Sequence, residues 1–485
     1  MSVELVGREA EYAGHLLLAW PGSSLGLGVV QREVLGAMAD MVESLLSSDA
    51  GMARCGTVRR LDVPAGPWSS VSAISLAGNP SRGQVWEALE DAFGACAGRV
   101  FVSAAAMPPL ALDLVEAVVG AAVVSTSSTG TGGEVPGAIS FRVLVADTER
   151  AAGVEQGARL VARALGRARA WTDAPGNRLG PSEFVEELCE QGRVAGLEVT
   201  RLDGAELAAR GYGGITAVAG GSSQPGWLVR LDHRPPDVNA RAPVALVGKG
   251  VTFDSGGLSL KTGSVMASMR RDMAGAAAVG AVMLALPTLR VQAAVRAYIP
   301  VVENMPGGSA YRPGDVVTLY GGRSVEIDTT DAEGRLILAE AMVTAFEDGA
   351  QEVIEVSTLC GAGVLGRHLS GVMGEDALVG HLLAAAHEAG EGLWRMPLPV
   401  QVREGLRSTA ADLHQVVPGG EWDSPMIQGG AFLSHFVPEG RAWAHIDLGG
   451  QVTRTSTSGT VASGVPVRTL LRFLTGRASR NDHAG

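Results

Sequence analysis

VGKGVTFDSGGLSLKTG (residues 247–263) joins a short apolar run to paired glycines and contains both lysines of the chain, Lys249 and Lys261. The other 37 of the 39 Lys plus Arg residues are arginine. A surface cation can be either residue, but only a lysine amine can lose its proton near neutral pH and offer a nitrogen lone pair to a metal ion. We therefore interpret this segment as the place where the chain needs lysine chemistry.

The residues on either side of this segment alternate between strand-like and helical patterns. Apolar runs typical of strands occur at 242–253, 291–302 and 352–363, and helical patterns at 273–287 and 332–349 separate them. This alternation predicts an α/β fold with a mixed, largely parallel sheet covered by helices. In such folds ligands bind at the loops that leave the carboxyl ends of the strands. The polar motifs of this chain occur at those loops.

The length of 485 residues exceeds what one hydrophobic core usually serves, so at least two domains are expected. We predict an N-terminal α/β domain (1–148), a linking helix (149–171) and a larger catalytic α/β domain (172–485). Strand-like runs at 99–107 and 140–147 support the first assignment, and 125–137 is expected to form an exposed loop. Residues 1–148 contain no cluster of catalytic residue types.

The composition excludes several classes of protein. Hydrophobic residues make up 46% and charged residues 19%, which is typical of a globular chain, and the net charge of -12 disfavours nucleic-acid binding. The N-terminus has no basic region followed by an apolar core, and no apolar run reaches membrane-spanning length without polar interruption, so we expect a soluble cytoplasmic protein with no membrane contact. The cysteines form no CxxC motif, so we expect reduced core residues at Cys55, Cys96, Cys189 and Cys360.

Candidate metal ligands occur in three short segments of the larger domain. Lys249 and Asp254 lie in GKGVTFDSGG, where Gly256 and Gly257 allow a sharp turn, and Asp272 lies in MRRDMAGAA. The third segment is TTDAEGRL (329–336), which contributes Asp331, Glu333 and Arg335. Four carboxylates and an amine, with no histidine or cysteine, would form a hard site suited to Mn, Mg or Zn. Four negative charges would be balanced by two divalent cations if one lysine coordinates as a neutral amine.

Each segment also has an ordinary structural explanation. Asp272, Asp331 and Glu333 could cap helices, where an anion is stabilised by about 0.3–1 kcal/mol, and Asp254 could be a turn residue. A phosphate-binding loop is disfavoured because GxxxxGK[ST] is absent. A two-metal phosphatase or nuclease would use the same carboxylates, but it would not explain a lysine ligand.

The order and spacing of the three segments resemble the leucine aminopeptidase family, also called cytosol aminopeptidases. The family signature is approximately NTDAEGRL, and the first two segments also resemble the family's metal-binding segments. The similarity continues through STLCGAGVLGRHLSGVM (357–373), GLWRMPLP (392–399) and AWAHIDLGG (442–450), and it covers roughly residues 170–475. The first 150 residues resemble the family only in size and loose α/β character.

The resemblance implies a role for each site residue. Two metal ions, Mn or Zn with Mg as an alternative, would be held by Lys249, Asp254, Asp272, Asp331 and Glu333. The catalytic cations would be Lys261, which stabilises the oxyanion, and Arg335, beside which the family binds a bicarbonate ion. The substrate-binding positions would be Met269, Thr329, Thr358 and Leu359.

The implied function is a metal-dependent aminopeptidase that releases N-terminal residues, leucine and other apolar residues above all, from peptides with a free amino terminus. The resemblance also implies a homo-hexamer. The alternative is a catalytically silent family member that acts as a binding or nucleic-acid regulatory protein, against which stands the complete set of seven polar site residues. The chain departs from the family at Thr329 (usually Asn), Thr262 (usually Pro) and Gly449 (commonly Ala).

Overall fold

The structure is a computed structural model that describes residues 148–236, 243–361, 365–420, 424–456 and 459–481, residues 86 and 89, and six N-terminal strands. The chain divides into two compact units. The smaller is Met1–Gly166 with Ser456–Gly459, and the larger is Arg167–Thr455 with Thr460–Gly485. The division falls inside helix α5 (Thr148–Asp173), which contains the predicted linking helix. The domain boundaries drawn from the sequence stay a prediction.

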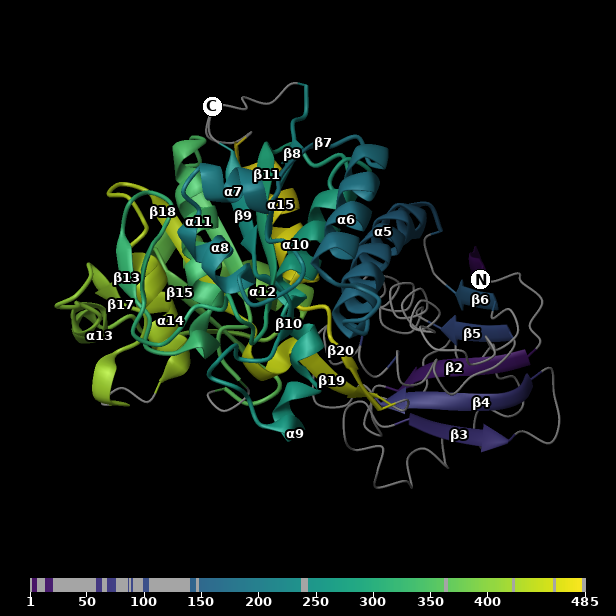
Figure 1. Ribbon diagram of the computed structural model, residues 1–485. Helices are drawn as coiled ribbons and strands as arrows, with labels where there is room; N and C mark the ends of the chain where they lie inside the picture. Colours follow the sequence, from purple (N-terminus) through teal and green to yellow (C-terminus); the bar gives the residue numbers. More distant parts are fainter. Residues whose placement is uncertain are drawn as a thin grey trace. The chain divides into compact units, whose positions relative to one another are not determined.

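The larger unit is built on a nine-stranded mixed sheet within the described residues (Figure 1). Its strands follow the order β16-β15-β18-β14-β9-β11-β8-β7, with β10 beside β11. Their bounds are β7 Glu198–Leu202, β8 Trp227–His233, β9 Val244–Gly248, β10 Gly250–Asp254, β11 Val295–Asn304, β14 Glu352–Ser357, β15 Ser370–Gly374, β16 Leu393–Arg395 and β18 Ala442–Asp447. Strands β18, β14, β9 and β11 run parallel to one another, whereas β15 pairs antiparallel with β18, β8 with β11 and β7 with β8. The predicted mixed, largely parallel sheet is confirmed.

Helices cover this sheet (Figure 1). The main ones are α6 Pro181–Val194, α8 Gly213–Ala219, α10 Ala274–Ala285, α11 Gly334–Glu347, α12 Asp376–Ala389, α14 Pro425–Ser434 and α15 Val467–Asn481, with short helices α7 Gly204–Ala209, α9 Gly263–Met266 and α13 Val400–Gly405. Helix α10 contacts α6 and the central strands, and α11 contacts α8 and the same strands. The predicted helical runs at 273–287 and 332–349 correspond to α10 and α11.

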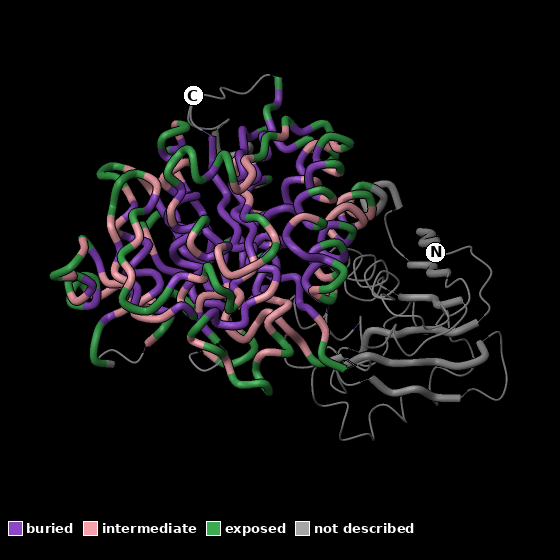
Figure 2. Tube along the Cα trace, viewed as in Figure 1, coloured by how far each residue is buried: buried purple, intermediate pink, exposed green. Residues whose placement is uncertain are grey.

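Small residues allow α10 to lie close to the sheet. Its first ten residues, 274–283, are all buried, because the sequence AGAAAVGAVM presents no polar face. A Cβ atom added at Gly275 would lie 2.1 Å from the carbonyl oxygen of Val356 in β14, so only glycine fits there. The central strand β9 (VALVG) is likewise buried at every position, as expected where helices cover both faces of a sheet. Figure 2 shows these buried residues gathered in the interior of the larger unit.

Smaller sheets complete the described chain. A three-stranded sheet joins β12 Val316–Thr318, β13 Ser324–Glu326 and β17 Leu413–His414, and β19 Thr453–Ser456 pairs with β20 Gly459–Ala462. The smaller unit contains a six-stranded sheet of order β1-β6-β5-β2-β4-β3. Its strands are β1 Ser2–Val6, β2 Gly14–Trp20, β3 Val58–Asp62, β4 Trp68–Ser75, β5 Arg99–Ser103 and β6 Ser140–Leu144. The last two fall within the predicted strand-like runs, and the predicted loop at 125–137 lies outside the described residues.

Two of the four cysteines and the described helices can be compared with the expectations from the sequence. Cys189 and Cys360 are free and buried, as predicted, whereas Cys55 and Cys96 lie outside the described residues. No helix in the described part of the chain combines the length and apolar character needed to cross a bilayer.

Candidate active site

A cavity of about 670 Å³ opens in the larger unit at the loops that follow the central strands. Six of the seven predicted metal-binding and catalytic residues line it, namely Lys249, Asp254, Lys261, Asp272, Asp331 and Arg335. Three predicted substrate-binding residues line it too, namely Met269, Thr358 and Leu359. The seventh polar residue, Glu333, is buried and contacts Lys249. The structure therefore brings the three sequence segments together in one place.

Strand ends and a glycine turn position the first segment. Lys249 lies between β9 and β10, and Asp254 is the last residue of β10. The chain then reverses through Gly256 (φ +87°) and Gly257 (φ +64°), backbone conformations that other residues rarely adopt. A Cβ atom on Gly256 would lie 2.3 Å from the carbonyl oxygen of Ser259. The turn brings Lys261 back toward Asp254, which explains why the two lysines are twelve residues apart in the sequence but share one site.

Lys249 lies between two buried carboxylates. Its Nζ atom is 2.8 Å from Oδ2 of Asp272 and 2.9 Å from Oε1 of Glu333, and it also donates to the carbonyl oxygen of Thr358 at 3.3 Å. Burial alone would lower the pKa of this amine, but Asp272, Glu333 and Asp254 outweigh burial and raise the pKa above its ordinary value. Without a bound cation, the amine therefore keeps its proton.

Lys261 bridges the other two carboxylates. Its Nζ atom lies 2.8 Å from Oδ2 of Asp254 and contacts Oδ1 of Asp331. Burial again opposes the charged form, and the two carboxylates again raise the pKa of the amine. Lys261 is more exposed than Lys249, with 15% of its side chain accessible against 3%. It therefore lies on the open side of the cavity, where a substrate can approach it.

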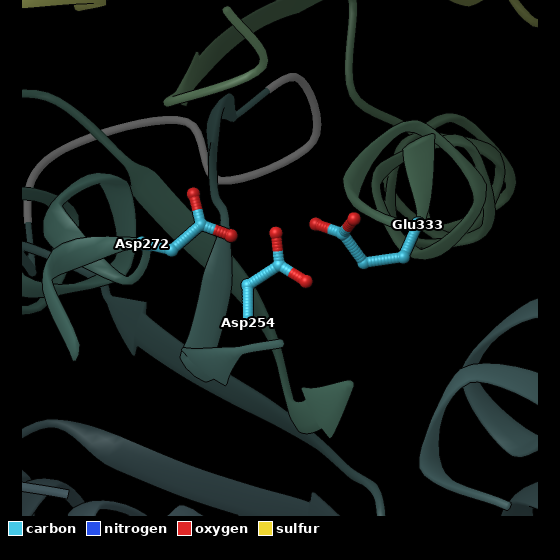
Figure 3. Close-up of side chains that lie close together, drawn as sticks. All are labelled: Asp254, Asp272 and Glu333. Carbon is cyan, nitrogen blue, oxygen red and sulfur yellow. The ribbon is translucent and has the colours of Figure 1, made fainter. Parts of the chain in front are cut away.

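The carboxylates of Asp254, Asp272 and Glu333 point toward one another (Figure 3). Each offers an oxygen, and these oxygens all lie within 4.8 Å of one another. Burial and the neighbouring Lys249 act in opposite directions on Asp272, and burial prevails, raising its pKa to about 6. Burial together with Asp254 raises the pKa of Glu333 to about 8. Close packing of buried carboxylates is unfavourable unless positive charge is supplied between them.

The donor set fits divalent cations. Oδ2 of Asp272 and Oε1 of Glu333 are buried and lie against the Lys249 ammonium, at 2.8 and 2.9 Å, where a bound cation would compete for the same oxygens. The ligand atoms that converge from Asp254, Asp272 and Glu333 are all oxygens, with the Lys249 nitrogen beside them, which suits hard ions such as Mn²⁺, Mg²⁺ or Zn²⁺. The residues present therefore fit the metal ions that the sequence implies.

The helix-cap explanation is not supported for the third segment. Asp331 lies in the short 3-10 turn Thr330–Ala332, and Glu333 precedes α11 without any side-chain cap hydrogen bond. Both carboxylates are instead directed to the lysines. A Cβ atom at Gly334 would lie 2.4 Å from Cε of Lys249, so glycine at this position lets the loop approach the amine.

Arg335 is buried beside the cavity with part of its donor capacity unused. Its Nη1 atom donates to the carbonyl oxygen of Gln415 at 2.7 Å, whereas its Nε atom is buried and donates no hydrogen bond. Burial lowers the pKa of the guanidinium to about 10, against the opposing influence of Glu333, Asp447 and Asp328. The side chain is still charged at neutral pH and has a free donor for an anion.

Two buried amides, which the sequence did not point to, hold the site in place. Asn304 Nδ2 donates to Asp254 Oδ1 and to the carbonyl oxygen of Thr330, both at 2.8 Å. Gln415 accepts from the Thr329 amide at 3.2 Å and donates to the Ala332 carbonyl at 2.9 Å, while its own carbonyl accepts from Arg335. The sequence VENMP around Asn304 contains no motif that predicts a role in the site. The same is true of the residues around Gln415, which follows β17.

Thr329 lies at the edge of this arrangement. Its hydroxyl accepts from the Asp331 amide at 3.3 Å, so it shapes the turn that presents Asp331. It is not among the described residues that line the cavity. Its predicted contact with substrate therefore stays a prediction.

Comparison with known proteins agrees with this geometry. The family model described as the cytosol aminopeptidase family, catalytic domain, matches residues 167–471. A probable cytosol aminopeptidase of Nocardia farcinica is 46% identical over 323 residues, which are 65% of this chain and 63% of that protein. The matched segment thus spans less than two thirds of this relative.

Two solved structures share the fold over nearly the whole chain. The bottromycin maturation enzyme BotP in complex with Mn is 30% identical, with a TM-score of 0.80 over 96% of this chain and 99% of that one. A mutant of tomato leucine aminopeptidase is 25% identical, with a TM-score of 0.86 over 98% of this chain and 96% of that one. With the family model matching well over half of its length, this chain belongs to the cytosol aminopeptidase family.

Proposed function

We propose that the protein is a metal-dependent aminopeptidase that removes N-terminal residues from peptides with a free amino terminus. The observation that carries the proposal is the convergence of two lysines, four carboxylates and Arg335 in and beside one cavity. Membership of the cytosol aminopeptidase family supports the same activity. The complete set of polar residues disfavours a silent binding protein, and the alternative role in nucleic-acid regulation has no observation in its favour.

Lys249, Asp254, Asp272, Asp331 and Glu333 would hold two divalent ions. When bound, such ions supply Lewis acidity, which polarises a peptide carbonyl and makes water more acidic. Asn304 orients Asp254 through one hydrogen bond, and Thr358 orients Asp272 by donating to Oδ1 at 2.6 Å. These neighbours fix the directions of the carboxylates before any ion arrives. The Mn complex of BotP makes Mn a reasonable first choice for this chain, with Zn and Mg as alternatives.

Lys261 and Arg335 would act on the substrate and on water. A compact ammonium on the open side of the cavity can stabilise the oxyanion that develops on the scissile carbonyl. The unused donor of Arg335 suits a bicarbonate ion, which would accept the proton that the attacking water loses. The pKa of about 10 keeps Arg335 charged for that purpose at neutral pH.

The side chain of the first residue would contact Met269, Thr358 and Leu359. Met269 and Leu359 offer apolar contacts in the cavity wall, so leucine and similar residues are the expected preference. The family resemblance also leads us to propose a homo-hexamer located in the cytoplasm.

The decisive experiment compares leucyl peptides with a free and an N-acetylated terminus, with Mn, Zn or Mg added and after chelation. Free peptides should be hydrolysed in a metal-dependent manner, whereas acetylated peptides should not be cleaved. A phosphodiester substrate serves as a control for the two-metal nuclease alternative. Equal cleavage of free and acetylated peptides would show that the proposed exopeptidase activity is wrong.

A further inference from the structure

One exposed basic residue of the cavity has no carboxylate partner among the described residues. Arg367 lines the cavity, its side chain is exposed, and it makes no ion pair with any residue in the described part of the chain. Of the other cavity-lining cations, Arg335 is buried and donates to the Gln415 carbonyl, and the remaining three have carboxylate partners. Lys249 and Lys261 contact the carboxylates of the site, and Arg271 donates to Asp173 at 2.7 Å.

The backbone beside Arg367 is held in place. Gln451 donates from Nε2 to the carbonyl oxygen of His368 at 3.2 Å, and its Oε1 accepts from the Ser370 hydroxyl at 2.6 Å. Gln451 belongs to the 3-10 turn Gly449–Val452, three residues of which line the same cavity. Arg367 therefore extends from an anchored part of the rim.

The cavity runs from a buried floor to an exposed rim. Lys249, Asp254 and Asp272 at the floor are 3%, 2% and 8% exposed, whereas Arg367, Gly361 and Thr460 at the rim are exposed. In an aminopeptidase the amino terminus reaches the site first, so the part of the peptide after the scissile bond faces the rim. A volume of about 670 Å³ is in the range of small-ligand sites and leaves room for a short peptide.

We propose that Arg367 recognises a carboxylate that follows the scissile bond, so that the preferred substrates are dipeptides with a free C-terminus. This inference rests on the proposed aminopeptidase function. An arginine matches a carboxylate through its planar fork of donors, and no carboxylate of the described residues forms an ion pair with Arg367 at the rim. In a dipeptide, the terminal carboxylate lies directly after the scissile bond, where a rim cation can reach it.

The test compares Leu-Gly with its C-terminal amide, Leu-Gly-NH₂, in wild type, Arg367→Gln and Arg210→Gln. Arg210 is an exposed arginine outside the cavity, so its variant removes the same charge as a matched control. Wild type and Arg210→Gln should favour the free acid over the amide by about tenfold in kcat/KM. Arg367→Gln should lose most of that preference and cleave the amide as wild type does, and Arg367→Lys should keep part of the preference. Because Arg367 is exposed, the preference should also shrink as salt is raised.

The outcomes separate this inference from the proposed function. If peptides are hydrolysed but wild type treats acid and amide alike, or Arg367→Gln keeps the full preference, the Arg367 inference is wrong while the aminopeptidase stands. If no peptide is hydrolysed, the proposed function fails, and the same two ligands are then titrated by calorimetry into the metal-loaded protein. Weaker binding of the acid to Arg367→Gln, with amide binding unchanged, supports the carboxylate site even then. Equal or absent binding of both ligands by wild type overturns it.

Discussion

Lys249 and Lys261 carry the same charge but lie in different surroundings, and each should fail in its own way when replaced. Lys249 is buried between Asp272 and Glu333, whereas Lys261 faces the open side of the cavity. Lys249→Arg removes the amine and forces a larger permanent cation against the metal ligands, so metal content and activity should fall together. Lys261→Arg keeps a cation but misplaces it, so metal content should stay near wild type while turnover drops by about 100- to 1000-fold.

Elemental analysis beside steady-state kinetics distinguishes these outcomes. Lys249→Met serves as a control for size, because methionine keeps the length of the aliphatic side chain and removes only the amine. If both arginine variants bind two metals and retain most of their activity, the rarity of lysine in this chain has no chemical meaning.

The sequence was informative at these residues because their types are unusual for their surroundings. Two lysines among 39 basic residues, and carboxylates beside glycines at strand ends, indicate chemistry that ordinary turns do not need. Asn304 and Gln415 could not be found in this way. Their side chains act only through hydrogen bonds to Asp254, Thr330, Thr329 and Ala332, which are partners distant in the sequence. Such contacts exist only once the fold has formed.

At the scale of elements, the loop that carries Asp331 and Glu333 depends on a neighbouring segment. Gln415, directly after β17, joins Thr329, Ala332 and Arg335. Gln415→Leu has a similar size but leaves the Thr329 amide and the Ala332 carbonyl unpaired, at a cost of about 1–3 kcal/mol. We expect a weaker affinity for metal and at least a tenfold lower kcat, with a smaller effect on KM.

The matched control is Gln401→Leu, which replaces an exposed glutamine of α13. Metal titration and kinetics of both variants test the effect. Wild-type metal affinity and kcat in Gln415→Leu would show that this glutamine does not position the loop.

Strands β8 and β11 contain a charge cluster whose effect on stability depends on pH. Asp232 of β8 is buried and pairs with Arg296 of β11, with Arg230 at 2.8 Å and with Arg234 at 3.2 Å. Burial would raise the pKa of Asp232, but the arginines outweigh burial and lower it below the ordinary value. The stabilisation is therefore fully present above the unfolded-state pKa, about 4, and is lost as the pH falls through the lower folded value.

Replacing Asp232 by asparagine should destabilise the protein by about 1.5–3 kcal/mol near neutral pH, because Arg296 loses its closest carboxylate and keeps only the Asp348 carboxylate, 3.9 Å away, among the described ion pairs. Melting temperatures measured from pH 7 to pH 3 should show a difference from wild type that is constant down to about pH 4 and shrinks below it. Asp315→Asn, in the exposed pair with Arg312, should change the melting temperature little at any pH. A difference that grows on acidification would mean that the pKa of Asp232 is raised instead.

Long periodic elements could be predicted from the sequence, and short ones could not. Helices α10 and α11 and strand β14 fall within the runs identified there, whereas β11 overlaps its run and continues two residues beyond it, to Asn304. Strands β12, β13 and β17 have only two or three residues, too few for a periodic pattern, and they are held by pairing with each other. The three-stranded sheet beside Gln415 was therefore missed, although it positions an important side chain.

At the scale of the whole molecule, family resemblance located the matching region closely. It indicated similarity over residues 170–475, and the family model matches residues 167–471. The motifs of this region are separated in sequence but fixed in order, so the probability that they all match by chance is small. The first 150 residues gave no such motif, although similarity extends into them, since matches to curated relatives cover up to 94% of the chain and the structural similarity covers up to 98%.

Metal binding should stabilise the whole larger unit, because the site joins residues from distant elements. Lys249 and Lys261 each contact two carboxylates, yet the pKa values of Asp272 and Glu333 are still raised, to about 6 and about 8, so without metal ions the two ammonium groups do not fully offset the burial and crowding of the carboxyl groups. Added Mn or Zn should raise the melting temperature and chelation should lower it. Free metal at 100 times its dissociation constant contributes about 2.7 kcal/mol if the unfolded chain does not bind it.

Asp331→Asn should weaken this response to metal. Asp331 is 37% exposed, so an asparagine side chain fits in its place without strain, but it carries no negative charge to attract a metal ion. Asp315→Asn, distant from the cavity lining, should keep the full response. Identical melting temperatures with metal, with chelator and in Asp331→Asn would contradict a metal site built from these residues, because a ligand that binds the folded state must raise its stability.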